Sequence, residues 1–163
     1  MLRLLPQRGP TSRGPVILRF GKHDFIKRGI TLPTEVINSQ NTQYVLRQIR
    51  QLYLRDSTVT IVLVGKCTWA RRFVDWELQA SLQRRAGGHP NGLIGILLDN
   101  STRPPRPPRF ELNRISGYAF YHRYPGSVAT LEEWIEDAYQ ARVIRRPKIK
   151  NPRERFRYNR SCK

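Results

Sequence analysis

Glu77 is the residue whose setting most strongly suggests chemistry in this sequence. It lies in TWARRFVDWEL (68–78), which follows a strongly apolar run and begins a helical pattern. A carboxyl group among aromatic and aliphatic side chains is desolvated, which raises its pKa, and its burial costs stability unless it is paired or used. The bland alternative is an ion pair on a solvated helix face, with Arg71, Arg72 or Arg84. Asp75 points elsewhere on the same helix.

Other familiar catalytic and metal-binding patterns are missing. Gly65-Lys66 lacks the frame of a phosphate-binding loop, and the sequence has no dinucleotide-binding glycine fingerprint and no nucleophile elbow. The three histidines have no partner at the i+3 or i+4 spacing of a helical metal site: His23, His89 and His122. We therefore predict no metal centre, and Glu77 remains the leading candidate.

Hydrophobic periodicity predicts the elements that position Glu77. Two runs rich in β-branched and aliphatic residues are typical of strands buried on both faces, Thr58–Val64 and Leu93–Leu98. Two amphipathic patterns predict helices, Gln43–Leu54 and Trp69–Arg85. Alternating strands and helices indicate a parallel α/β sheet, in which ligands bind beyond the carboxyl ends of the strands. This directs attention to Gly65–Thr68, Asp99–Thr102 and the residues just after Phe20.

The second half of the chain has weaker signals. Ser101–Arg109, dense in proline and arginine, is expected to be a stiff connector. Ile115–Tyr121 is a possible third strand, and Leu131–Arg142 is predicted to be a helix that begins with a capping box formed by Thr130 and Glu133. The residues after it are expected to form a basic tail, docked in part through Ile149 and Phe156.

Composition limits the architecture and the class of partner. With 163 residues and 39% hydrophobic content, the chain is long enough for one domain with a core. The net charge is +18, and it is concentrated at the ends: residues 1–28 hold seven bases and one acid, and residues 142–163 hold ten bases and one acid. Such ends favour contact with nucleic acid or another anionic partner, although a genome-wide arginine bias explains them equally well.

Cysteine use and hydropathy bear on the compartment. Cys67 and Cys162 are far apart and form no motif, so we expect free thiols and a cytoplasmic chain. No apolar run approaches the length of a transmembrane helix, and Met1–Pro15 lacks the apolar core of a secretory signal. We therefore predict no contact with a membrane.

The segment from 57 to 78 resembles the TIR-like family that includes the ThsB proteins of Thoeris antiphage defence. The matching pieces are Val62-Leu63-Val64-Gly65, then Thr68, then Phe73-Val74-Asp75-Trp76-Glu77-Leu78. TIR domains at large carry a W-C-x-x-E version of the last piece, in which the glutamate is the catalytic residue of NAD-cleaving members. That position falls on Glu77, with Phe73 in place of the first tryptophan.

The resemblance implies a flavodoxin-like, three-layer α/β fold with a mostly parallel sheet. It also implies that NAD is the substrate, with no separate cofactor, and that the nicotinamide–ribose bond is cleaved to give a linear or cyclic ADP-ribose product. In this interpretation Glu77 is catalytic, and the nucleotide is contacted by Gly65, Thr68, Phe73 and Trp76. A carboxylate suits this chemistry because bond breaking builds positive charge on the ribose.

The sequence departs from the family at its beginning. Members start with a central strand, a loop that ends in aspartate and a full first helix, whereas only Val16–Asp24 can stand in for them here. His23 and Asp24 are then the candidates for that wall of the pocket, and the first strand and first helix are doubtful. We divide the chain into a flexible basic leader, 1–15, a TIR-like domain, 16–145, and a basic C-terminal tail, 146–163.

Three functions follow from these features. The first is a TIR-like NAD hydrolase or cyclase. The second is a catalytically inactive TIR-like module that binds a protein partner or assembles with itself. The third is nonspecific nucleic-acid contact through the basic ends, where Phe156-Arg157-Tyr158 interleaves aromatic and basic residues.

Overall fold

The computed structural model of the chain describes residues 2–3, 38–54, 57–83, 88–99 and 103–162. Val16–Asp24, the segment proposed to replace the first strand, lies outside these residues, and so does nearly all of the expected leader. The structure therefore bears on the fold from residue 38 onward and on a two-residue strand at Leu2–Arg3.

The sheet has four strands in the order β1-β2-β3-β4. β2 (Val59–Val64), β3 (Gly92–Leu97) and β4 (Phe120–His122) are parallel, and β1 (Leu2–Arg3) pairs antiparallel with β2. β3 is buried at every position and β2 at all but one, as expected of central strands covered on both faces. The predicted mostly parallel sheet is confirmed.

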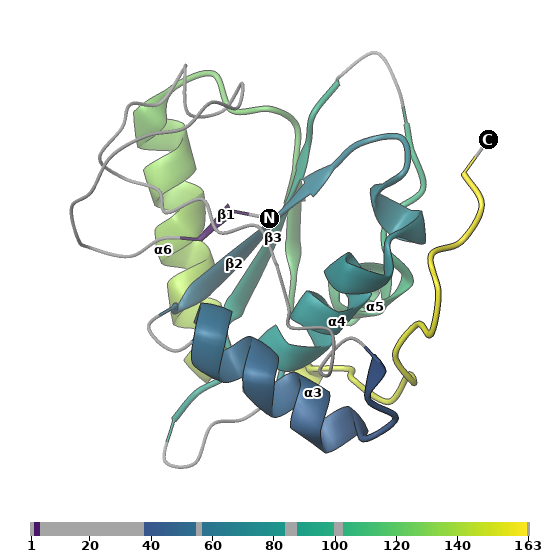
Figure 1. Cartoon of the computed structure of the whole chain (residues 1–163). Coiled ribbons are helices and arrows are strands. Elements are labelled where there is room, and N and C mark those ends of the chain that lie inside the picture. Colours follow the sequence, from purple (N-terminus) through teal and green to yellow (C-terminus); the bar gives the residue numbers. More distant parts are fainter. Residues whose placement is uncertain (1, 4–37, 55–56, 84–87, 100–102, 163) are drawn as a thin grey trace.

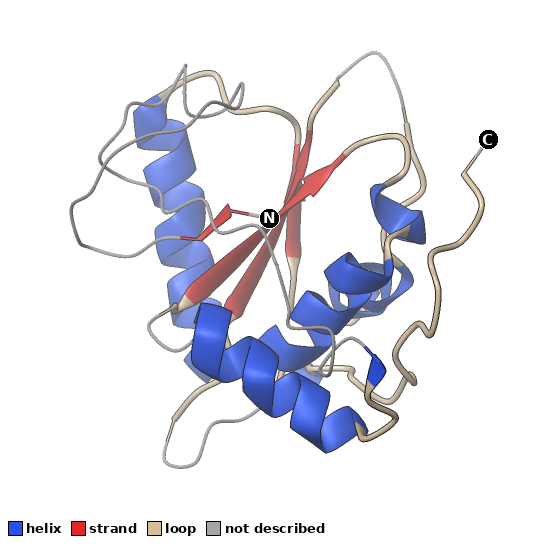
Figure 2. Cartoon of the chain, viewed as in Figure 1, coloured by secondary structure: helices blue, strands red, loops and turns tan. Residues whose placement is uncertain are grey.

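Helices cover both faces of the sheet (Figures 1 and 2). α6 (Val128–Ile144) packs on one face, against the side chains of β2 and β3 that point toward it. α3 (Thr42–Ile49), α4 (Arg72–Ser81) and α5 (Pro108–Ile115) lie on the other. α6 comes so close to β3 that a Cβ atom at Gly92 would strike the carbonyl of Ala138. The fold is thus the predicted three-layer α/β arrangement.

The two helices predicted before and after β2 are both present, with irregular ends. α3 continues as one π-helical stretch, Arg50–Leu54, so the predicted span is helical throughout. The second prediction began at Trp69, but there the chain forms a 3₁₀ turn, Thr68–Ala70. Arg71 then adopts an extended conformation (φ −89°, ψ 119°), which separates that turn from α4.

Three predictions for the second half are wrong in detail. Ile115–Tyr121 is not one strand, because Ile115 ends a helix and β4 begins only at Phe120. Pro108–Ile115 forms α5, which the proline-rich sequence concealed, although proline suits the first turn of a helix because its missing N–H has no partner there. The last helix begins at Val128 and is capped by Ser127, whose Oγ accepts the N–H of Thr130 at 3.1 Å. The capping box at Thr130 is therefore not used.

The C-terminal residues 150–162, here called the strap, run back along α4 and α5 (Figure 1, yellow). Phe156 is buried and Ile149 packs against the core beneath α4 and α5, as predicted for docking residues. The prediction of free thiols is wrong, because the strap brings Cys162 onto Cys67, and the two form a disulfide across 95 residues of sequence. Because the two cysteines are so far apart in the sequence, no local sequence pattern indicates that they pair.

Candidate functional site

Glu77 is buried in α4, with only 5% of its surface exposed. Glu77 therefore does not lie on a solvated helix face. One turn further along α4, the Oγ of Ser81 donates to the carbonyl of Glu77 at 2.7 Å and accepts from the hydroxyl of Thr60 at 2.9 Å. Because residues i and i+4 share a helix face, Glu77 and Ser81 lie on the face turned toward β2.

The other faces of α4 are occupied by different parts of the fold. Phe73, Trp76 and Ala80 pack against α3, whereas Val74, Leu78 and Leu82 pack into the core with β2, β3 and α5. At 100° per residue, Glu77 falls between these two sets. Glu77 thus lies between the face of α4 that packs on α3 and the face that packs into the core with β2.

Gly65 and Thr68, two of the predicted nucleotide-contacting residues, form the turn at the carboxyl end of β2. The Oγ1 of Thr68 accepts the N–H of Gly65 at 3.0 Å and donates to the carbonyl of Leu63 at 3.0 Å. The structure brings these two residues together, and it uses the threonine hydroxyl to close the turn. In the sequence, this turn comes after β2 and before α4.

Phe73 and Trp76 also meet, but they do so on the α3 side of α4. Their rings make an edge-to-face contact with centroids 5.5 Å apart. Trp76 is almost fully buried, and its indole N–H donates to the carbonyl of Phe156 in the strap at 2.6 Å. The indole therefore holds the strap in place. His23 and Asp24 lie outside the described residues.

Asp75, which the sequence marked only as pointing away from Glu77, is the centre of a buried ion pair. Its side chain is 2% exposed and that of Arg109 is not exposed at all, with Nε–Oδ1 at 3.1 Å and Nη2–Oδ2 at 3.4 Å. The Oδ2 of Asp75 also accepts the backbone N–H of Phe156 at 2.9 Å. One carboxylate thus joins α4, α5 and the strap.

The ion pair is extended by polar side chains that hold the strap along its length. Arg109 donates through Nη2 to the carbonyls of Arg153 at 2.8 Å and Glu154 at 3.3 Å. The side-chain amide of Asn113 donates to the carbonyl of Lys150 at 2.7 Å and accepts its N–H at 2.9 Å. The sequence did not lead us to predict a site at Asp75, Arg109 and Asn113. One signal for it was present, because Asp75 and Gln79 are two polar residues spaced i,i+4 in a helix that was expected to be apolar.

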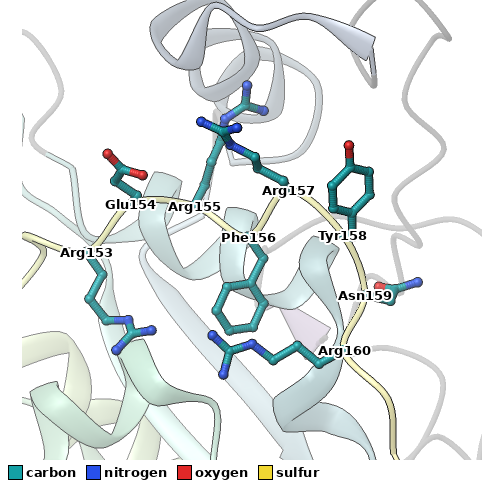
Figure 3. Close-up of a pocket in the computed structure, with 8 residues that line it drawn as sticks. All are labelled: Arg153, Glu154, Arg155, Phe156, Arg157, Tyr158, Asn159 and Arg160. Atoms are coloured by element: carbon teal, nitrogen blue, oxygen red, sulfur yellow. The ribbon is translucent and has the colours of Figure 1, made fainter.

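The strap borders a shallow depression. Residues 153–160 line a shallow depression of about 510 Å³, which contains four arginines and one acidic residue (Figure 3). Arg153, Phe156 and Arg160 extend to one side of the strap, and Arg157 and Tyr158 extend to the other. The depression follows the strap, which contacts the Asp75 side of α4, whereas Glu77 and Ser81 lie on the side that faces β2.

The family model for Thoeris protein ThsB, TIR-like domain, matches residues 21–103, just over half of the chain. The chain belongs to this family. No curated protein and no solved structure gives a match. The ThsB-type match contains α3, β2, α4 and β3, and all seven residues predicted for the site fall inside it. α5, β4, α6 and the strap lie beyond it.

Membership of the ThsB TIR-like family confirms the resemblance on which the site was predicted. It assigns the chain to the Thoeris-type TIR-like proteins and agrees with the observed α/β fold. Every described helix is too short or too polar to cross a lipid bilayer. Within the described part of the chain, no three His, Cys, Asp or Glu residues gather as a metal site would require.

Proposed function

We propose that this protein cleaves the nicotinamide–ribose bond of NAD in a Thoeris-type defence response, with Glu77 as the catalytic carboxylate. The observation that carries the proposal is that Glu77, at the position of the TIR glutamate, is buried on the face of α4 turned toward β2, outside the network that holds the strap. The family match supports the assignment, because it includes this helix.

The proposed reaction needs little from the protein beyond one placed carboxylate. As the C–N bond to nicotinamide lengthens, positive charge builds on the ribose, and a carboxylate beside the ribose stabilises that charge or orients the hydroxyl groups. Water then adds to the ribose carbon and releases a proton, which leaves ADP-ribose and nicotinamide. If a nitrogen of the same molecule adds instead, the product is cyclic.

Surroundings of low polarity strengthen this effect. Glu77 adjoins two apolar sets of α4, the one packed on α3 and the one packed in the core, so its interactions are weakly screened by water. The turn formed by Gly65 and Thr68 lies at the carboxyl end of β2, which is where parallel sheets bind their ligands. In this proposal that turn packs beside the nucleotide, since the hydroxyl of Thr68 and the N–H of Gly65 are both used within the turn.

The test is NAD turnover by the purified full chain, followed as nicotinamide release by liquid chromatography. We expect Glu77→Gln to lower the rate about 100-fold or more, the range measured when one preorganised electrostatic group is removed. Glu132→Gln, a matched change at an exposed carboxylate on α6, is expected to leave the rate unchanged. Circular dichroism confirms that both variants are folded.

Two results would count against this function. Equal rates for wild type and Glu77→Gln would remove Glu77 from the catalytic role. If the wild-type chain leaves NAD intact even at high concentration, the inactive TIR-like interaction module becomes the better interpretation. Chromatography of the products also separates linear from cyclic ADP-ribose.

A further inference from the structure

The strap differs from an ordinary charged tail because its backbone is fixed at many points. Asp75, Arg109 and Asn113 hold its first half. Its second half is held by the indole of Trp76, by a bond of 2.8 Å from the N–H of Arg160 to the carbonyl of Ala70, and by the disulfide of Cys162. The charges that it carries are thus presented in a set order, at little entropic cost on binding.

These charges are not neutralised within the described part of the chain. Residues 150–162 carry five bases and one acid. Every ion pair between described residues uses Glu111 or Asp75: Arg106 and Arg114 contact the first, and Arg109 contacts the second. The arginines of the strap take no part in these pairs. An external anion is therefore the partner that this surface lacks.

The exposed members of the strap define a small recognition surface. Arg155 is used internally, since its guanidinium donates to the carbonyl of Ser39 at 2.7 Å and to the hydroxyl of Thr42 at 3.2 Å. Phe156 is buried, as predicted for a docking residue, so its ring is not open to a ligand. The exposed residues of the strap include Arg157, Tyr158 and Arg160, with Tyr158 77% exposed, together with the acidic Glu154. Arg157 extends to the same side of the strap as the open ring of Tyr158, whereas Arg160 extends to the other side, where its guanidinium lies over the ring of Phe156.

We propose that this surface binds single-stranded nucleic acid, with Arg157 and Arg160 at the phosphates and Tyr158 stacked on a base. Single strands are bound by basic grooves that combine backbone contacts with aromatic platforms, and the shallow depression along residues 153–160 has this form (Figure 3). An acidic protein surface would use the arginines and leave the tyrosine ring without a stacking partner. A duplex keeps its bases stacked inside, beyond the reach of one ring.

The binding test uses the full chain with its disulfide intact and a fluorescein-labelled 20-mer of deoxythymidine, followed by anisotropy at several KCl concentrations. The double variant Arg157→Gln/Arg160→Gln should bind more weakly, and the slope of log K against log salt should fall by about 1.4, because each phosphate contact on a single strand contributes about 0.7. Tyr158→Ala should weaken binding about fivefold or more, with the slope unchanged.

The matched control is Arg47→Gln/Arg123→Gln, which removes the same charge from exposed residues on α3 and after β4. It should retain nearly all of the wild-type affinity and slope. An equal loss in this control would reduce the effect to overall charge and overturn the proposal. Equal binding of a duplex of the same length, or of an acidic peptide of the same net charge, would overturn it as well. The outcome is independent of NAD turnover, because Glu77 lies on another side of α4.

Discussion

Two carboxylates of α4, two residues apart, are both buried, yet they lie on nearly opposite sides of the helix. Asp75 faces α5 and the strap, and its two oxygens receive three hydrogen bonds, two from Arg109 and one from the N–H of Phe156. Glu77 faces β2, beside Ser81 and the apolar set that packs on α3. Burial alone thus does not distinguish a structural acid from a candidate catalytic one.

The difference lies in what each carboxylate joins. Asp75 connects three segments that are distant in sequence, and its removal leaves Arg109 charged and fully buried. Both carboxylates lie in the sequence that matches the ThsB TIR-like family, but the partners of Asp75, which are Arg109 and the strap, lie beyond that match. We therefore assign Asp75 to stability and propose Glu77 for chemistry, and the following experiments test that division.

The largest effect is expected from Asp75→Asn. It keeps the shape of the side chain but leaves the buried guanidinium of Arg109 without its counter-charge, so the free energy of unfolding should fall by about 3–5 kcal/mol in urea titrations. Glu77→Gln is the matched change on the other side of the helix, and it should cost clearly less. Equal losses would show that both carboxylates hold the fold, and the division would fail.

A smaller loss is expected when the end of the strap is released. The disulfide closes a loop of 95 residues, and removing a native disulfide commonly costs about 2–4 kcal/mol, in part because the unfolded chain gains freedom. Cys67→Ser/Cys162→Ser should therefore unfold at a lower urea concentration than the oxidised wild type. Reductant should shift the wild type to the same midpoint and leave the variant unmoved. A reductant-sensitive variant would contradict this account.

The elements near Glu77 could be predicted because their signals are local. Thr58–Val64 and Leu93–Leu98 are nearly unbroken apolar runs, and the structure places β2 and β3 within one residue of them. The α3 pattern of Val45, Ile49 and Leu52 predicted a helix for the same reason, although Leu52 is 44% exposed at the irregular end. Hydrophobic periodicity was therefore enough to predict these strands and this helix, because each of them buries apolar residues of its own.

The region around Asp75 could not be predicted because its partners are remote. Arg109 follows a run of prolines and looks solvated in sequence, and only the return of the strap shows why it is buried. Cys67 and Cys162 likewise meet only because the strap follows α4. Of the predicted site residues, Gly65 with Thr68 and Phe73 with Trp76 are in contact as pairs, while His23 and Asp24 lie outside the described residues.

A further prediction concerns Trp76, which contacts α3 and the strap at once. Trp76→Phe removes the indole donor to the carbonyl of Phe156 and some packing volume, so a loss of about 1–2 kcal/mol is expected. Trypsin should then cleave after Arg157 faster than in the wild type, as followed by mass spectrometry. Trp134→Phe, on α6 across the sheet, is the control and should leave that cleavage rate unchanged. An unchanged rate in Trp76→Phe would contradict its role at the strap.

The smallest effect is expected at Glu111, a carboxylate on α5 that sharpens the contrast with Asp75. Hydrogen bonds from Arg114 and then Arg106 lower its pKa from an ordinary value of 4.5 to about 2. Because the folded chain prefers the charged form, this contribution is fully present above pH 4.5 and is lost as the pH falls toward 2. The side chain is partly solvated, so the loss should be about 1 kcal/mol or less.

Urea titrations at pH 5 and pH 3 measure this loss directly. Glu111→Gln should be less stable than the wild type at pH 5, and this difference should be roughly halved at pH 3, whereas Glu132→Gln, at an exposed position on α6, should track the wild type at both. If Glu111→Gln instead costs as much as Asp75→Asn at pH 5, solvent access does not set the strength of these ion pairs. The difference between the buried carboxylate of Asp75 and the partly solvated one of Glu111 would then depend on how many segments of the chain each one joins.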